Sequence, residues 1–384
     1  MIMTVDHERF GLTEQQELIR QAARRLAREV IAPTAAARDK SSAWPHEELK
    51  AVGELGFMGM MIPEEYGGSE IGFLNYALVI EELSAADAGL GTIVHVHNLG
   101  GAMPLYQLGS RDQRQKYLPA VARGELIGAA MLTEPHSGSD TAAFKTSARL
   151  DGDHYVLNGT KHYVSNGSEA GFALVLAVTD KTAGKNGFTT FLVDPKAPGV
   201  DVLRIEDKLG QHTAHTTQMA LSDVRVPVEN VVGAVGCGYR DMMRLLSDGR
   251  IGIAAQAVGI AQAALDAAVS YAKEREAYGK PIIELQGVAF KLAEMATEID
   301  VARQYYRHVA RMIDAGIPCS KEAAIAKLFA SEMAERVCSE ALQVHGGAGY
   351  TRDFPVERFL RDVRICRIYE GTSEIQKLII SRNL

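Results

Sequence analysis

The segment from residue 146 to 165, TSARLDGDHYVLNGTKHYVS, consists of short apolar runs separated by turn-forming residues. Asp151-Gly152 and Asn158-Gly159 favour tight hairpin turns, because both residue types in each pair tolerate positive φ. The same pattern of short apolar runs and turn-forming residues extends from about residue 126 to 235, with no helical periodicity. It predicts an antiparallel barrel or sandwich built from candidate strands at Ile127–Leu132, Thr146–Leu150, His154–Leu157, Lys161–Ser165, Phe172–Thr179, Phe188–Val193 and Gln218–Val226.

Helical periodicity is found on both sides of this segment. Before residue 126, apolar residues recur at four-residue spacing, and Pro33 is expected to end the first helix. Two pairs have the spacing of helix-capping boxes: Thr13 with Gln16 and Ser110 with Gln113. After residue 235 three longer helices are predicted, over 242–275, 286–315 and 320–344, and Gly346-Gly347 ends the third.

The order of helices, strands and helices defines an α+β chain with three expected domains, over residues 1–125, 126–235 and 236–384. It argues against a nucleotide-binding α/β fold, in which strands and helices alternate. Lys and Arg number 41 against 48 Asp and Glu, a net charge of −7, which argues against a nucleic-acid partner. The four cysteines lack zinc-ligand or CxxC spacing, so no metal is expected. Met1–Phe10 has no apolar core and no apolar run could span a bilayer, so we expect a cytoplasmic protein without a membrane partner.

Four segments combine glycine, hydroxyl side chains and charge beyond what packing requires. The loop 132–140, LTEPHSGSD, supplies hydroxyls, and Gly138 lets backbone approach a ligand, although a plain polar hairpin loop has the same composition. Arg275 follows a long helix, where a cation is favoured in any case. Two consecutive glycines, Gly346 and Gly347, exceed what a helix C-cap needs.

Glu370 is the candidate catalytic residue in the fourth segment. A carboxylate before a glycine and beside free backbone N–H groups is well placed to act on a ligand, although a surface glutamate at a helix end is equally consistent. His95 and His97 alternate as on an extended segment, and we interpret them as ordinary packing or polar contacts.

Taken together, these segments resemble the acyl-CoA dehydrogenase family of flavoproteins. The resemblance covers nearly the whole chain through eight motifs in order: MIPEEYGG (61–68), MLTEPHSGSD (131–140), GTKHYVSNG (159–167), KLG (208–210), GRIGIAAQAVGIAQAALD (249–266), REAYGKPI (275–282), QVHGGAGY (343–350) and IYEGTSEIQ (368–376). It implies a helical N-terminal domain, a central β-barrel and a C-terminal domain resembling a four-helix bundle.

The resemblance also implies non-covalent FAD and assigns residues to it. The flavin and its pyrophosphate would meet residues of the middle domain: Ala130, Met131, Leu132, Thr133, Gly138, Ser139, Tyr163, Val164 and Ser165. The FAD of a neighbouring subunit would meet Arg275, Gln286, Gln343, Val344, His345, Gly346 and Gly347. The adenosine end would meet Thr372, Ser373 and Glu374, and the acyl-CoA would be bordered by Ser139, Ser247, Arg250 and Gly371.

The chemistry that the resemblance implies is α,β-dehydrogenation of an acyl-CoA thioester. Glu370 would take the α-proton, and the β-hydride would pass to flavin N5 and on to an electron-transfer flavoprotein. Some members place the base at the position of Gly249, which cannot act as one here. A homotetramer built as a dimer of dimers is expected. Tyr163, His212 and Ala214 depart from the family pattern, at positions that usually hold Trp, Arg and Ser.

Two other functions stay open at this point. A member of the same fold could act as an oxidase, monooxygenase or desulfinase, although the intact segment around Glu370 argues against members that lack the base. A non-catalytic acyl-CoA-binding or assembly protein would need neither Glu370 nor flavin. The acyl group itself is not specified, with a slight preference for short or branched chains.

Overall fold

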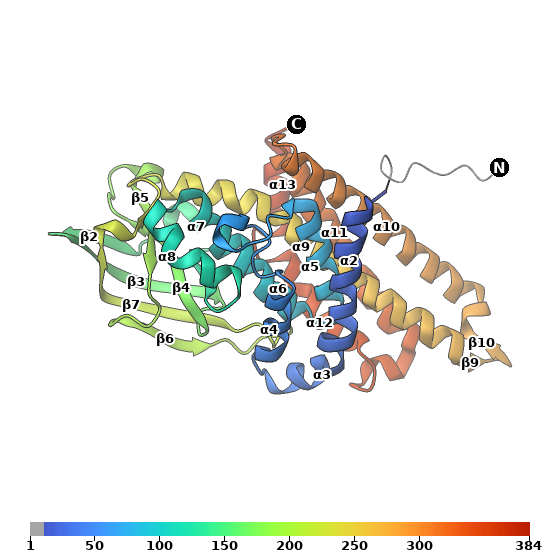
Figure 1. Cartoon of the computed structure of the whole chain (residues 1–384). Helices are drawn as coiled ribbons and strands as arrows, with labels where there is room; N and C mark the ends of the chain where they lie inside the picture. Colours follow the sequence, from blue (N-terminus) through green and yellow to red (C-terminus); the bar gives the residue numbers. More distant parts are fainter. Residues whose placement is uncertain (1–10) are drawn as a thin grey trace.

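The computed structural model describes residues 11–384, so the expectation for Met1–Phe10 lies outside the described residues. Figure 1 shows three regions along the chain: helices, then a β region at one end of the molecule, then a long helical bundle that reaches the other end. The mixed α+β class is confirmed. The domain boundaries after residues 125 and 235 stay a prediction.

Helices account for most of the chain from residue 14 to residue 122. The two predicted capping boxes, at Thr13 and Ser110, are both confirmed. The helical elements are α2 (Glu14–Leu26), a π-helical turn (Ala27–Ile31), α3 (Ala32–Ser41), α4 (His46–Glu54), a 3-10 turn (Glu64–Tyr66), α5 (Gly72–Ala86), α6 (Ala88–His95), a second π-helical turn (Val96–Ala102), α7 (Met103–Leu108) and α8 (Arg111–Ala122).

The prediction that Pro33 ends the first helix is wrong. Helical backbone continues from α2 through the π-helical turn into α3, and Pro33 lies in the first turn of α3. A proline is tolerated there because the hydrogen-bonding register changes at the π turn, so the N–H that proline lacks is not needed for a regular helical hydrogen bond. The helical run therefore extends to Ser41.

The middle region is an eight-stranded sheet in the order β6-β7-β3-β2-β4-β5-β8, with β1 paired to β4. Most pairs are antiparallel, but β1 runs parallel to β4 and Ser147 pairs with Val178 in parallel, so the expectation of a purely antiparallel sheet is corrected. Closure into a barrel stays a prediction. The strands are β1 (Ile127–Met131), β2 (Ser147–Asp151), β3 (His154–Ser165), β4 (Ala170–Val178), β5 (Phe188–Val193), β6 (Val200–Ile205), β7 (Thr216–Pro227) and β8 (Val231–Val232).

One of the two predicted hairpin turns is confirmed and the other is wrong. Asp151 pairs with His154 across a turn at Gly152, whose φ is 65°. Asn158-Gly159 instead lies inside β3, where the pairing with β7 is irregular. A Cβ at Gly159 would overlap Thr146, so glycine is needed there for close packing of strands rather than for a turn.

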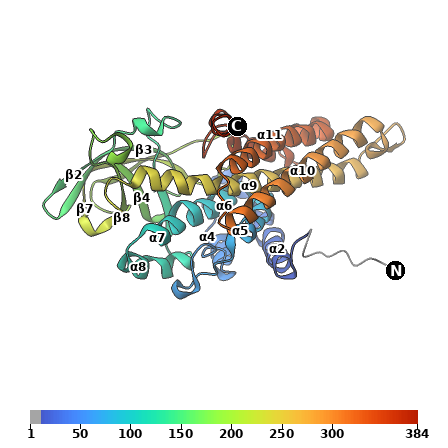
Figure 2. The same ribbon diagram turned by 90° about the horizontal axis from the view of Figure 1, so that it is seen from above.

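The C-terminal region is helical and is organised around α9. Its elements are α9 (Gly238–Glu274), the short hairpin β9 (Glu276–Ala277) and β10 (Lys280–Pro281), α10 (Gln286–Asp314), α11 (Ser320–His345), a 3-10 turn (Gly346–Tyr350), α12 (Val356–Val363) and α13 (Ser373–Ser381). At 1.5 Å per residue α9 is about 55 Å long. Both ribbon views show it extending from beside the strands to the far end of the bundle (Figures 1 and 2).

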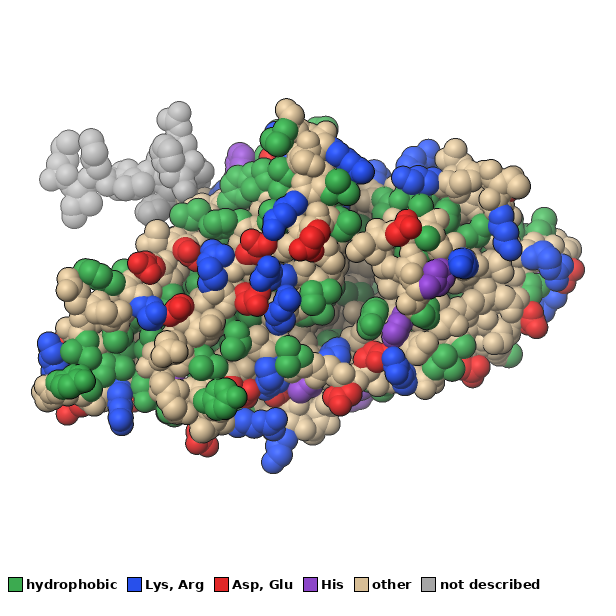
Figure 3. Space-filling model, turned by 180° about the vertical axis from the view of Figure 1, so that it is seen from behind, with side chains coloured by type: hydrophobic (Ala, Val, Ile, Leu, Met, Phe, Trp, Pro, Cys, Tyr) green, Lys and Arg blue, Asp and Glu red, His purple; other side chains and the backbone are tan. Residues whose placement is uncertain are grey.

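Helix α9 has the length and composition that would permit a membrane crossing. However, 78% of its most apolar 18-residue window is buried inside the protein. Burial of this kind is typical of a core helix, so length and composition are weak evidence for a membrane span. The face seen in Figure 3 carries interspersed acidic and basic side chains.

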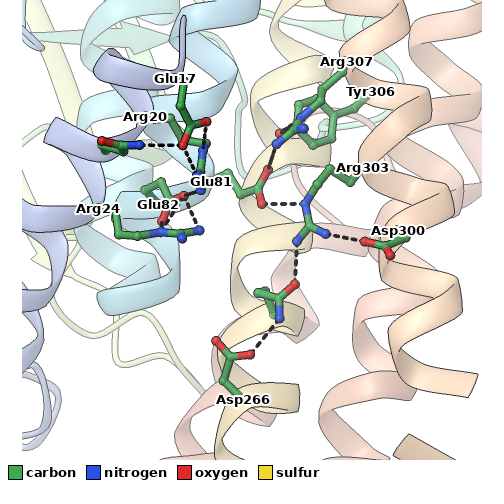
Figure 4. A network of polar contacts seen from close by, with 12 residues as sticks. Glu17, Arg20, Arg24, Glu81, Glu82, Asp266, Asp300, Arg303, Tyr306 and Arg307 are labelled. Carbon is green, nitrogen blue, oxygen red and sulfur yellow. Dashed lines mark hydrogen bonds and ion pairs between the residues drawn. The ribbon is translucent and has the colours of Figure 1, made fainter. Parts of the chain in front are cut away.

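A polar network fastens α2 and α5 to the bundle beside α9 (Figure 4). Glu82 on α5 pairs with Arg20 and Arg24 on α2, at 3.0 and 2.9 Å. The neighbouring Glu81 accepts hydrogen bonds from Arg303 Nε, at 2.9 Å, and from the Tyr306 hydroxyl, both on α10. Two adjacent carboxylates therefore join three helices.

Helix α5 approaches α9 closely at Gly259, where a Cβ would overlap the backbone carbonyl of Glu81. We expect Gly259→Ala to lower the free energy of unfolding by about 1–3 kcal/mol, because neither backbone can move without disturbing the core. Urea denaturation would measure it. As a control, Gly287→Ala in α10 adds a methyl in open space and should be neutral or stabilising by up to about 1 kcal/mol. Equal effects of the two substitutions would contradict this account.

Candidate active site

Glu370 lies in the turn that precedes α13. Its backbone is in the left-handed region, with φ of 51°, and Gly371 follows with φ of 94°. Two buried side chains hold this turn. Gln376 Nε2 donates to the Gly371 carbonyl at 2.8 Å, and Lys327 Nζ, on α11, donates to the same oxygen at 2.7 Å. The carboxylate is therefore carried on a fixed, strained turn rather than on a free surface loop.

Lys327 is an unusual support for this turn because its side chain is fully buried. Burial lowers the pKa of Lys327 to about 8, with Arg250 adding to this effect and Cys366 and Glu370 opposing it. Sequence reasoning did not single out this residue. A lysine in the otherwise apolar run AAIAKLFA was the available signal.

The carboxylate of Glu370 has two unequal oxygens. Oε1 lies 2.5 Å from His95 Nε2, and the other ring nitrogen of His95 contacts the Tyr76 hydroxyl. Oε2 is buried and has no hydrogen-bond partner within residues 11–384. A buried carboxylate oxygen without a donor is costly, so its presence marks a place where a reacting group is expected.

His95 and His97 are not on an extended segment, and this part of the sequence interpretation is wrong. His95 is the last residue of α6, and His97 lies in the π-helical turn that follows. Residues two apart on a helix point to different sides, which separates their roles. His97 Nε2 lies 3.1 Å from the Met58 and Val121 carbonyls, and burial lowers the pKa of His97 to about 4. His97 is thus a structural contact, whereas His95 belongs to the site.

Helix α9 forms the wall opposite Glu370. A Cβ at Gly249 would lie 3.2 Å from Glu370 Oε2, so the two positions face each other. Arg250 Nη1 donates to Ser247 Oγ at 3.0 Å. Burial lowers the pKa of Arg250, and the charges of Glu370 and Asp248 oppose the shift. Three of the predicted substrate residues (Ser247, Arg250 and Gly371) thus lie around Glu370, whereas Ser139 is exposed on the loop after β1.

Tyr163 presents a flat aromatic surface near the end of β3. Its side chain is 63% exposed and its backbone is in the left-handed region, with φ of 54°. The ring stacks on His162, with 3.9 Å between centroids and 10° between planes. His162 Nε2 is in turn 2.7 Å from Glu206 Oε1, which fixes the ring beneath. An exposed and supported ring of this kind suits a planar ligand.

Three family models match this chain. They are the N-terminal domain of acyl-CoA dehydrogenases, over residues 13–125, the middle domain, over 129–224, and the C-terminal domain, over 236–384. The chain belongs to the acyl-CoA dehydrogenase family.

Relatives agree with this assignment along the whole length. The short-chain specific acyl-CoA dehydrogenase of Clostridium acetobutylicum is 43% identical over 372 residues, which cover 97% of this chain and 98% of the relative. Butyryl-CoA dehydrogenase from Megasphaera elsdenii superposes with a TM-score of 0.95 at 39% identity, over 97% and 99% of the two chains. A chain from the structure described as the electron transferring flavoprotein of Acidaminococcus fermentans superposes with a TM-score of 0.96 at 44% identity, over 97% and 98%.

Acyl-CoA dehydrogenases are FAD-dependent oxidoreductases, and this chain is one of them. The residues present fit the cofactor. Beside the exposed Tyr163 ring, the loop after β1 leaves room for a ligand, because a Cβ at Gly138 would meet only the Thr133 methyl group, at 3.8 Å. Of the other predicted contacts, Met131 and Val164 are buried, and Ala130, Leu132, Thr133 and Ser165 are half-buried.

A buried ion pair that the sequence analysis missed supports this loop of the dehydrogenase. Lys161 Nζ, on β3, lies 2.9 Å from Glu134 Oε1 and donates to the Leu132 carbonyl at 2.8 Å. The Glu134 carboxylate also accepts from the backbone N–H groups of Lys145 and Thr146, at 2.7 and 2.9 Å. Burial lowers the pKa of Lys161 to about 8, against the attraction of Glu134. The pair joins the loop to β3 and to the segment just before β2.

The residues expected to reach a neighbouring subunit's FAD lie at the opposite end of the enzyme. Arg275 follows α9 and is about 38 Å along the helix from Arg250, beside the β9–β10 hairpin at the far end of Figure 1. His345 stacks on Tyr271 of the same region, with ring centroids 4.4 Å apart. Arg275, Gln286, Gln343, Gly346 and Gly347 are exposed there, whereas Val344 and His345 are buried.

The remaining predicted contacts and departures are placed as follows. Thr372 caps α13 by accepting from the Ile375 N–H, Ser373 is buried, and Glu374 is exposed. His212 contacts the Asp39 carbonyl at 2.9 Å and the Lys208 carbonyl at 2.7 Å, so it fastens its loop to the end of α3. Ala214 is buried.

We expect Lys161→Met to lower the free energy of unfolding by about 3–5 kcal/mol, because it leaves the Glu134 carboxylate buried without its counter-charge. Urea denaturation would measure the loss. The double variant Lys161→Met with Glu134→Gln removes both charges and should recover part of it. A double variant less stable than the single one would refute the pairing as the cause.

Proposed function

We propose that this enzyme converts an acyl-CoA thioester to the trans-2-enoyl-CoA, with Glu370 as the base that takes the α-proton. The observation that carries this proposal is Glu370 Oε2, which is buried, lacks a partner and faces α9 at Gly249. The facing position on α9 is Gly249, which has no side chain that could act as the base. The neighbouring Arg250 and Ser247 supply donors for the polar part of a substrate.

The backbone of the same turn supports the thioester. An α-proton of a saturated thioester is weakly acidic, so its removal requires donors aimed at the carbonyl oxygen. The N–H of Glu370 donates no hydrogen bond within residues 11–384, although the carbonyls of this turn are engaged. It is free to serve as such a donor. Bound FAD supplies the acceptor for the hydrogen that leaves the β-carbon with its electron pair.

We propose that the flavin rests against Tyr163 and the loop 130–139, and that the cofactor site is completed by a second subunit. Arg275, at the far end of α9, and the Gly346-Gly347 surface at the same end of the bundle lie too far from Tyr163 and the loop 130–139 to meet the FAD of their own chain. Their exposed side chains and backbone suit the FAD of a neighbour, in a dimer of dimers. The electron acceptor would be an electron-transfer flavoprotein, in keeping with the solved structure described above.

The packing beneath Glu370 favours a short acyl group. A Cβ at Gly252 of α9 would overlap both His95 and the Tyr76 hydroxyl, so α9 lies directly against these side chains. A long acyl chain therefore finds no path between α9 and this pair. The names of the two relatives, short-chain and butyryl-CoA dehydrogenases, agree with this proposal.

Glu370→Gln should retain FAD and bind acyl-CoA, yet lower the rate of flavin reduction by about 10²–10⁴-fold, because an amide cannot accept the proton. Stopped-flow bleaching of flavin absorbance by butyryl-CoA measures this. Glu229→Gln, an exposed carboxylate at the end of the β region, is the control. Reduction of Glu370→Gln at the wild-type rate would remove Glu370 from its role.

A panel of saturated acyl-CoA thioesters, with acyl chains of about four to sixteen carbons, tests the substrate proposal. We expect kcat/KM to be highest near the short end. Each methylene contributes about 1 kcal/mol only when it can be buried, so kcat/KM should fall once the acyl chain exceeds the space before Gly252. Steady-state assays with a dye acceptor give the profile. A maximum at long chains would overturn the proposal.

Arg275→Ala should weaken FAD binding more than acyl-CoA binding. A guanidinium paired with the FAD pyrophosphate contributes about 1.5–3 kcal/mol through charge-assisted hydrogen bonds. Lys273→Ala, in the last turn of the same helix, controls for a cation that only complements the helix dipole, worth about 0.3–1 kcal/mol. FAD dissociation constants decide between them, and equal constants for both variants would place Arg275 outside the cofactor site.

A further inference from the structure

Three side chains form a line that ends at the proposed base. Tyr76 on α5 contacts His95 Nδ1, and His95 Nε2 on α6 lies 2.5 Å from Glu370 Oε1. Tyr76 is fully buried, His95 is 2% exposed and the Glu370 side chain is 17% exposed. The chain thus brings three segments together to engage only one of the two carboxylate oxygens.

The direction of each hydrogen bond in this line follows from satisfying the buried groups. The Tyr76 hydroxyl has only His95 as a partner within residues 11–384, so its proton must be donated to Nδ1. Burial, and secondarily the charge of Glu370, raise the pKa of Tyr76 well above its ordinary value, so that proton stays on the phenol. Nδ1 is then an acceptor, and the ring carries its proton on Nε2. His95 Nε2 therefore donates to Glu370 Oε1.

Helix α9 is shaped to admit this pair. Gly252 lies where a Cβ would overlap both His95 Nδ1 and the Tyr76 hydroxyl. Any larger residue would displace the rings and break the line. The position of the histidine is thus determined from three sides, by α5, by α6 and by α9.

We propose that Tyr76 and His95 form a positioning pair that immobilises Oε1 of Glu370 and reserves Oε2 for the α-proton. This inference rests on the proposed function. His95 holds a proton rather than passing one on, because the line ends at a fully buried phenol with no path to solvent. The reserved oxygen is the one that faces α9 without a partner.

The hydrogen bond at Oε1 is one of several polar interactions of the Glu370 carboxylate. A hydrogen-bond donor to a carboxylate stabilises its charged form, whereas burial without such a donor stabilises the protonated form. Two other charged groups interact with Glu370, Arg250 from α9 and Lys327 from α11, and Asp248 interacts with Arg250. Those groups remain in a His95 variant, so a change in the pH profile on substitution of His95 measures the contribution of this donor.

The test compares His95 variants of the holoenzyme by stopped-flow flavin reduction with butyryl-CoA, over a range of pH. In His95→Leu we expect the rate near neutral pH to fall about 10- to 100-fold, the effect of losing a charge-assisted hydrogen bond, and the acidic limb of the profile to move to higher pH. His95→Gln, whose amide can donate from the same place, should restore most of the rate and the limb. Tyr76→Phe should lose several-fold, because Nε2 is then no longer held as the donor.

A matched control separates positioning from general damage. His97→Leu removes a buried histidine two residues away whose hydrogen bonds, among the described residues, go to Met58, Val121 and Gly128, so it should lower stability and leave the pH profile in place. An unmoved profile in His95→Leu, or a His95→Gln variant as slow as His95→Leu, would overturn the inference. If Glu370→Gln keeps its reduction rate, the proposed function fails instead, so the two failures are distinguishable.

Discussion

Helix α9 has 37 residues, and its long apolar middle must be covered by other elements; this requirement organises the dehydrogenase. Helices α5, α10 and α11 pack on α9, and Gly259 lets α5 approach it to backbone distance. Because α9 also extends from the β region to the far end of the bundle, every segment that packs on it acquires a fixed place relative to both ends.

The proposed active site follows from that packing. Glu370 arrives from the C-terminal turn, His95 from α6 and Arg250 from α9, so no local segment contains the site. A glycine on α9 permits each close approach: Gly249 lies opposite the carboxylate and Gly252 lies opposite the histidine. The helix that fills the core therefore leaves space at two glycines, one beside the reacting carboxylate oxygen and one beside the histidine that positions the carboxylate.

The order of helices and strands could be predicted from the sequence, because periodicity and capping residues act locally. Elements set by tertiary contact could not. Asn158-Gly159 has the composition of a turn, yet β2 and β7 hold it in a strand. Strand β6 was missed because its residues are largely exposed and Asp201 and Arg204 interrupt its apolar pattern. Glu370 could be predicted through a motif, whereas His95 could not, since its partner is 275 residues away.

The backbone of Glu370 bears on any attempt to make this enzyme more robust. A residue with a side chain in the left-handed region is strained by about 1–3 kcal/mol, and only glycine relieves that strain without moving the chain. The most stable residue at position 370 is therefore glycine, which is also the residue that ends the chemistry. Thermostabilisation guided by folding energy alone would select against the base, so position 370 has to be held fixed in such a design.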